Sequence, residues 1–161
     1  MPYFLKAGLW IKKRIGNRGE IPIFPVEHSY NVQGGTDADQ PTFDGAPLFR
    51  ASYTDTYSDL VYFNIHVNMS NITSFGTGQY FMTLPFNSKY YMTFTDGHLH
   101  NEAHDFDYQL SGFVEAGSNV IKLSYQGANG LLAPFTSTAP RQLTTADFFH
   151  ISGTYLKQQT T

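Results

Sequence analysis

The stretch from Asp96 to Asp107 holds most of the groups that could do chemistry. It reads DGHLHNEAHDFD and contains three histidines and four carboxylates. In an extended chain His98 and His100 share a face, because alternate side chains of a strand point the same way, and His104 can fold back onto them. Imidazole and carboxylate groups are ligands for zinc, nickel or copper. Two interpretations stay open: a metal site made by these histidines, which a trimer could complete, and a hydrated loop between strands.

Motifs for catalysis are missing from the sequence. Serine, histidine and aspartate are abundant, but no nucleophile elbow and no paired-carboxylate arrangement is present. His66 and His150 fall within expected strands and are interpreted as surface or structural residues. We therefore expect no enzymatic activity and no required cofactor. A metal-dependent enzyme on a cupin-like barrel, using the three histidines of the polar stretch, is the remaining enzymatic alternative.

A long strand from Asp59 to Met69 is the clearest structural signal. Apolar and polar residues alternate along it, which is typical of a strand with one buried and one exposed face. Gly76 and Gly78 then allow a positive φ or a bulge at a corner between strands, and Gly153 indicates a bulge or a close approach of a neighbour. The apolar set of the long strand is Val61, Phe63, Ile65, Val67 and Met69, and the polar set is Tyr62, Asn64, His66 and Asn68.

Short strands separated by turn residues continue through the rest of the chain, and no stretch has helical periodicity with caps. This pattern predicts an all-β fold, a β-sandwich of jelly-roll type with about seven to eight antiparallel strands. The polar stretch 96–105 is expected to be a loop. The main strands are expected at 48–54, 59–69, 79–84, 89–95, 106–114, 120–125 and 148–156.

The 161 residues suit one compact domain with an extended N-terminal arm. Residues 1–40, with two prolines at Pro22 and Pro25 and a Gly-Gly turn, are expected to be the arm and linker, and residues 41–161 the β-sandwich. Charged residues are only 14% of the chain, whereas aromatic residues are 16%. A surface so poor in charge is either neutral and polar or covered by partners. The chain has no cysteine and no apolar run long enough to cross a bilayer, so we expect no membrane partner.

The charge is unevenly placed along the chain. The first 19 residues carry five basic side chains and no acid, while the remainder has a net charge of −8. We expect this basic segment to dock on an acidic neighbouring protein, since five charges without interleaved aromatic residues are a poor nucleic-acid footprint. A solvated terminus is the alternative. The basic residues are Lys6, Lys12, Lys13, Arg14 and Arg18.

Four segments resemble a family of small β-rich phage virion domains, often found at the C-terminal end of tail or fibre proteins. The resemblance covers residues 40–156, and Phe43-Asp-Gly45 stands where the family has a Gly-Asn-Gly turn. It implies a non-enzymatic virion component that forms a homotrimer and contacts other virion proteins. The matching segments are Gln40-Pro41, Ala46–Tyr53, Phe75–Pro85 (FGTGQYFMTLP) and Phe149–Tyr155 (FHISGTY).

The sequence thus favours a structural protein of a bacteriophage particle, in the tail, a fibre or a capsid decoration, with its location in the virion. The alternative is a carbohydrate-binding module that recognises a glycan of the host surface, because sugars stack on aromatic side chains. Cross-strand packing or subunit interfaces would use the same residues. The tyrosines available are Tyr53, Tyr57, Tyr62, Tyr80, Tyr90, Tyr91, Tyr108 and Tyr125.

Overall fold

The computed structural model describes residues 3–6, 9–12, 26–55, 59–101, 106–127 and 129–159. Over these ranges the chain consists of strands and connecting turns, with no helix, and every strand pairing is antiparallel. The predicted all-β class is therefore confirmed. β1 (Tyr3–Lys6) and β2 (Leu9–Lys12) pair with each other in a two-stranded sheet of their own.

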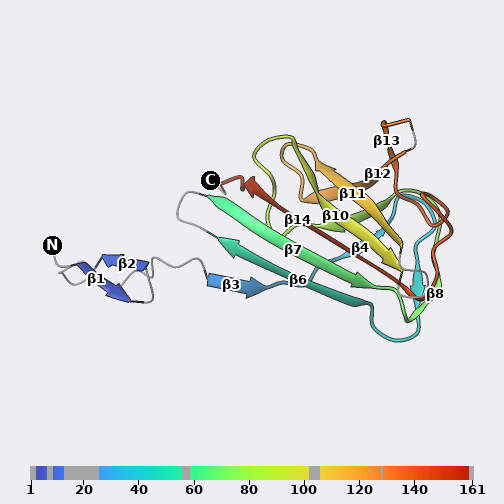
Figure 1. Ribbon diagram of the computed structural model, residues 1–161, viewed down its shortest axis with the longest axis horizontal. Helices are drawn as coiled ribbons and strands as arrows, with labels where there is room; N and C mark the ends of the chain where they lie inside the picture. Colours follow the sequence, from blue (N-terminus) through green and yellow to red (C-terminus); the bar gives the residue numbers. More distant parts are fainter. Residues whose placement is uncertain are drawn as a thin grey trace.

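The main sheet has ten strands and curls around the core (Figure 1). Its order is β3-β6-β7-β14-β10-β11-β12-β9-β4, with β13 paired to β12, and β5 pairs with β8 separately. The strands are β3 (Val26–Ser29), β4 (Gly34–Thr36), β5 (Thr42–Phe43), β6 (Leu48–Asp55), β7 (Leu60–Asn68), β8 (Ile72–Ser74), β9 (Tyr80–Thr83), β10 (Met92–Asn101), β11 (Phe106–Val114), β12 (Val120–Gln126), β13 (Leu132–Pro134) and β14 (Asp147–Leu156).

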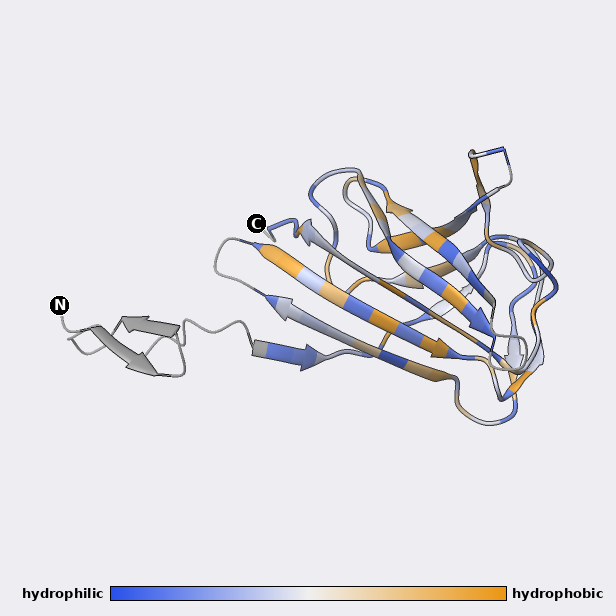
Figure 2. Ribbon diagram, in the orientation of Figure 1, coloured by the Kyte–Doolittle hydropathy of each residue, from blue (hydrophilic) through white to orange (hydrophobic). Residues whose placement is uncertain are grey.

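The inner face of the curled sheet forms the core. Along β7 the side chains alternate between buried and exposed, as its sequence pattern predicts, and Figure 2 shows the matching change of hydropathy along the strand. Phe63 is fully buried, with its ring centre 4.9 Å from that of Phe94 and 6.1 Å from that of Tyr155. The Tyr155 hydroxyl donates to the Phe86 carbonyl oxygen at 3.0 Å and accepts the Phe86 N–H at 3.1 Å, so its polar end is satisfied inside the core.

Gly153 lies in β14 at the tightest point of this aromatic packing. A Cβ atom placed on Gly153 would lie 2.4 Å from Cδ1 of Phe94 and 3.1 Å from Cε1 of Phe63. The backbone of β14 therefore approaches two rings so closely that only glycine fits there without displacing them.

Gly76 and Gly78 turn the chain at a corner before β9. Their φ angles are 69° and 94°, in the left-handed region that favours glycine. The corner is fastened to residues 37–39: the Thr77 hydroxyl donates to the Asp39 carboxylate at 2.9 Å, and the Gln79 N–H donates to Asp37 Oδ1 at 2.7 Å.

A buried carboxylate joins β14 to its surroundings at the N-terminal end of the strand. The side chain of Asp147 is fully buried and pairs with Arg141. It also accepts from Asn101 Nδ2 at 2.5 Å and from the Thr144 N–H at 2.6 Å. A charge removed from water in this way depends on all of its partners.

Residues Tyr30–Gln33, here called the closing segment, connect the two ends of the curled sheet. The Tyr30 N–H donates to the Ala51 carbonyl oxygen in β6 at 3.2 Å, and the Tyr30 hydroxyl donates to the Thr83 carbonyl oxygen in β9 at 3.0 Å. Gln33 then exchanges hydrogen bonds with Thr83. Residues 26–36, expected to be arm and linker, thus supply β3, β4 and the closing segment, and the sheet begins well before Pro41.

Two further expectations are wrong. The sheet has ten strands, more than the seven to eight predicted, because β3, β4 and β13 are too short to show a periodic pattern. Residues 96–101 are also not a loop: they continue β10. A register shift between Phe94 and Gly97 interrupts the alternation there, so that two consecutive residues, Thr95 and Asp96, are both exposed.

Candidate functional site

The outer face of the sheet over β6, β7 and β14 has few charges. Because the strands are paired in register, their outward-facing side chains form cross-strand rows. Arg50 is the one side chain with a permanent charge among these described outer residues. The set is Leu48, Arg50, Ser52 and Thr54 from β6, Leu60, Tyr62, Asn64, His66 and Asn68 from β7, and Phe148, His150, Ser152, Thr154 and Leu156 from β14.

Three histidines from three neighbouring strands form one of these rows, here called the histidine row. His66 of β7 pairs with His150 of β14, which pairs with His98 of β10. The ring centres of His66 and His150 are 5.4 Å apart and stacked, and those of His150 and His98 are 4.2 Å apart and edge-on. His66 and His98 are exposed and His150 is half-buried. The row therefore presents several imidazole nitrogens side by side on a rigid surface.

His150, in the centre of the row, is biased towards its neutral form. Burial lowers the pKa of His150 below its ordinary value, and the neighbouring His98 and His66 lower it further, while Asp96 acts in the opposite direction. A neutral imidazole has one nitrogen lone pair free to accept a hydrogen bond or bind a metal ion.

A second pair of groups lies next to the histidine row. His100 follows His98 on the same face of β10, and its Nδ1 lies 2.6 Å from Asp107 Oδ1 on β11. The His100 ring also packs against Phe148, with ring centres 4.8 Å apart. These contacts hold the orientation of the His100 ring.

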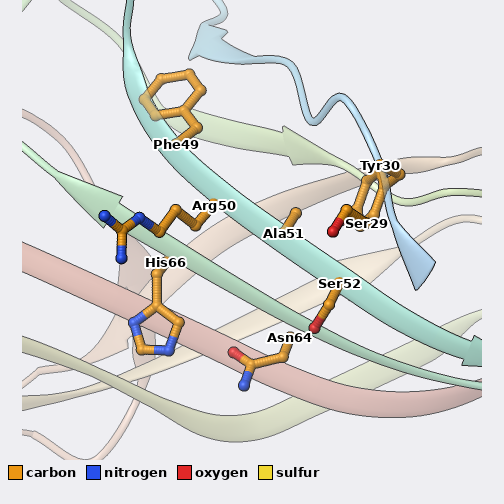
Figure 3. A pocket seen from close by; sticks show the side chains of 8 residues that line it. All are labelled: Ser29, Tyr30, Phe49, Arg50, Ala51, Ser52, Asn64 and His66. Atoms are coloured by element: carbon orange, nitrogen blue, oxygen red, sulfur yellow. The ribbon is translucent and has the colours of Figure 1, made fainter. Parts of the chain in front are cut away.

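Arg50 extends the histidine row onto β6, where it is paired with His66. It forms no ion pair in the described part of the chain. Two open depressions, of about 390 Å³ and about 550 Å³, share Arg50 and His66 in their walls. Figure 3 shows the first, with Arg50 beside the His66 ring and Ser52 and Asn64 further along the same two strands.

The opposite end of the same face is apolar. Leu60 and Tyr62 at the start of β7 are 39% and 47% exposed, and Leu156 of β14 pairs with Leu60. Tyr90 and Tyr91, before β10, are more than half exposed, and the preceding residue, Lys89, donates its N–H to the Leu156 carbonyl oxygen at 2.8 Å. Residues Leu60, Tyr62, Leu156, Tyr90 and Tyr91 are here called the apolar end of the outer face. Large exposed side chains of this kind favour contact with another protein surface.

His98 and His100 lie in β10 rather than in a loop, and His104 lies outside the described residues. Lys6 and Lys12 end β1 and β2, while Lys13, Arg14 and Arg18 lie outside the described residues. As the side chains stand, no three histidine, aspartate or glutamate residues of the described ranges converge on a common metal position.

The histidine row cannot be recognised as a unit from the sequence. His66 and His150 fall in two expected strands, but 84 positions separate them in the sequence and only the pairing of β7 with β14 brings them together. The alternation predicts that both side chains lie on the outer face, but it does not predict the register of the two strands. Arg50 carried no signal of its own, because a single arginine in a strand is common on any solvated face.

Comparison with protein-family models, with curated protein sequences and with solved structures gives no match. No helix in the described part of the chain is long and apolar enough to cross a membrane.

Proposed function

We propose that this chain is a structural protein of a bacteriophage particle, a tail, fibre or capsid-decoration component that forms a homotrimer and does no catalysis. The observation that carries the proposal is the apolar end of the outer face, where Leu60 and Tyr62 stand exposed on a surface with few charges. Burial of such side chains against another copy would remove them from water, and charged residues are depleted in the centres of protein interfaces.

The charge distribution supports the second part of the proposal, docking on another virion protein. The first 19 residues carry five basic side chains, whereas the rest of the chain has a net charge of −8. An acidic groove on a neighbouring subunit would attract this segment without attracting the rest of the chain. In this proposal the curled sheet is a variant of the jelly-roll sandwich, with its two halves facing each other across the core.

Light scattering on the full chain tests self-assembly. We expect the mass of a trimer for the wild-type chain and a shift towards the monomer for Tyr62→Lys, which places a charge in the apolar end. Ala46→Lys is the matched control, because Ala46 is an exposed residue just before β6, at the end of the β6–β7 pair opposite to Tyr62. A wild-type monomer at high concentration would overturn the proposal.

The virion location needs a separate measurement. Phage particles whose genome encodes this chain should contain it in a fixed copy number, and mass spectrometry of particles purified by density gradient measures that number. Finding the chain only in the soluble fraction of infected cells would contradict a structural role.

A carbohydrate-binding module is the second candidate, and the depression of about 390 Å³ is the observation that favours it. Ser52, Tyr30 and the unpaired Arg50 line it, and Asn64 Oδ1 has no hydrogen-bond partner among the described residues. Hydroxyl, amide and guanidinium groups of this kind suit a sugar that carries a carboxylate. A glycan array with wild type and Arg50→Ala tests it: signal for acidic glycans that Arg50→Ala abolishes supports this candidate, and a blank array removes it.

A further inference from the structure

We propose that the histidine row binds one transition-metal ion of the zinc, nickel or copper class through imidazole nitrogens of His66, His150 and His98. This site differs from the cluster in residues 96–107 that the sequence suggested, because two of its three ligands come from β7 and β14. The proposal does not depend on the proposed function, since it concerns a different part of the outer face from the apolar end.

The spacing of neighbouring rings in the histidine row is close to the spacing that a shared metal ion requires. A zinc–nitrogen bond of about 2.0 Å places the centre of each imidazole ring about 3.2 Å from the metal. Two rings bound to one ion at angles between 90° and the tetrahedral angle then have centres roughly 4.5–5.2 Å apart. The observed separation of His66 and His150, 5.4 Å, is slightly above this range, and that of His150 and His98, 4.2 Å, is slightly below it. His66 and His98 lie on either side of His150, so both rings must turn towards it to share one ion.

The strands that carry the ligands are held in register by the sheet. β14 lies between β7 and β10, so His150 is in the middle and adjacent to both other ligands. Ligands on paired strands keep their backbone positions, and only side-chain rotation is needed to bind. His66 and His98 are exposed and have space to turn towards an ion above His150. The proposed site requires this rotation, because no three such groups converge as the side chains stand.

The neighbouring groups indicate which ion fits. All three proposed ligands are imidazoles, which suit zinc, nickel and copper, whereas calcium and magnesium prefer several oxygen ligands. Arg50 next to His66 opposes a cation, and Asp96, which accepts from Ser152 Oγ at 2.5 Å, favours one. Gln109 opposite His98 is neutral.

Isothermal titration of the full chain, stripped with a chelator and titrated with ZnCl₂, NiCl₂ or CuSO₄, measures binding. We expect one ion per chain with a micromolar dissociation constant, and at least a tenfold loss of affinity in His150→Ala. His66→Ala and His98→Ala should each weaken binding as well. His150→Gln keeps a polar side chain of similar size, and its thermal unfolding, compared with that of wild type, separates lost ligation from lost folding.

Two histidine variants outside the row are the controls. His28→Ala removes an exposed imidazole that stacks on Tyr53, and His100→Ala removes one that Asp107 holds, and both should retain wild-type affinity within about twofold. The electron paramagnetic resonance spectrum of the copper complex should show coupling to three nitrogens in wild type and to two in His66→Ala. The proposal is overturned if no saturable binding occurs below about 1 mM, or if His100→Ala abolishes binding while His66→Ala does not.

Discussion

On β7 the side chains of Phe63 and Ile65 are fully buried, whereas those of Tyr62 and His66, their neighbours in the sequence, are exposed on the other face. The inner face is packed with aromatic rings whose polar groups are satisfied within the core, and the outer face carries polar and imidazole groups open to solvent. Adjacent positions in one strand therefore have separate roles. Substitutions on the inner face should change stability, and those on the outer face should change binding while leaving stability nearly unchanged.

The strongest test of this comparison is Phe63→Ala. Removing a fully buried ring that packs against Phe94 and Tyr155 leaves a cavity. We expect the free energy of unfolding to fall by about 3–5 kcal/mol. Urea unfolding, followed by far-ultraviolet circular dichroism, measures this loss. His66→Ala, measured without added metal, is the matched control on the outer face of the same strand, and an equal loss there would contradict the distinction between the faces.

Arg141→Ala should be the next largest effect. It leaves the fully buried carboxylate of Asp147 without its cation, although Asn101 and the Thr144 N–H still donate to it. We expect a loss of about 3 kcal/mol in the free energy of unfolding. Asp147→Asn in the same background should recover part of it, because the uncompensated charge is then gone. A double variant no more stable than Arg141→Ala alone would contradict this account.

Gly153→Ala tests how closely the backbone of β14 approaches the aromatic rings of the inner face. The added methyl group would meet Phe94 and Phe63, so rings must shift to admit it. We expect a loss of about 1–3 kcal/mol in the free energy of unfolding. Thr154→Ala, the exposed neighbour of Gly153, should change stability by less than about 0.5 kcal/mol. Thermal unfolding of both variants side by side decides whether the close approach is as tight as the distances indicate.

The smallest expected effect is on the pH dependence of the free energy of unfolding, and it involves His150 on the outer face. Because the pKa of His150 is lowered in the folded state, the unfolded chain takes up a proton first as the pH falls. The free energy of unfolding should therefore fall between the ordinary pKa of histidine and the lowered value, and stop falling below it. His150→Gln removes this part of the pH dependence. Urea unfolding of both chains at about pH 7.5 and about pH 5 measures the difference, and identical slopes would show that His150 titrates normally.

Much of the fold follows from the local pattern of the sequence. Features that depend on residues close together in the chain can be predicted from the sequence. Examples are the alternation in β7, the turn at Gly76 and Gly78 and the boundaries of β11. Strands of two to four residues, such as β4 and β13, do not span enough residues for a period to emerge. The second half of β10 is not predicted from the sequence, because the bulge after Phe94 breaks the alternation that identifies a strand.

The candidate site was less accessible to sequence reasoning for a different reason. His98 and His100 were recognised because they lie two residues apart. His66 and His150 become partners only through long-range pairing, and a shift of one residue in the register would place either of them on the inner face. The histidines of the row are therefore brought together only by the packing of the whole sheet, which fixes the register of β7 against β14.

The closing segment determines how this chain can be shortened for laboratory work. A fragment that begins at Gln40 would lack β3, β4 and Tyr30, and would leave the outer edges of β6 and β9 without the partners they have in the full chain. Unpaired edges recruit other strands, so such a fragment should precipitate or form intermolecular sheets. A fragment that begins at about residue 26 keeps β3 paired with β6 and β4 paired with β9. It is the shortest fragment that we expect to remain soluble at high concentration.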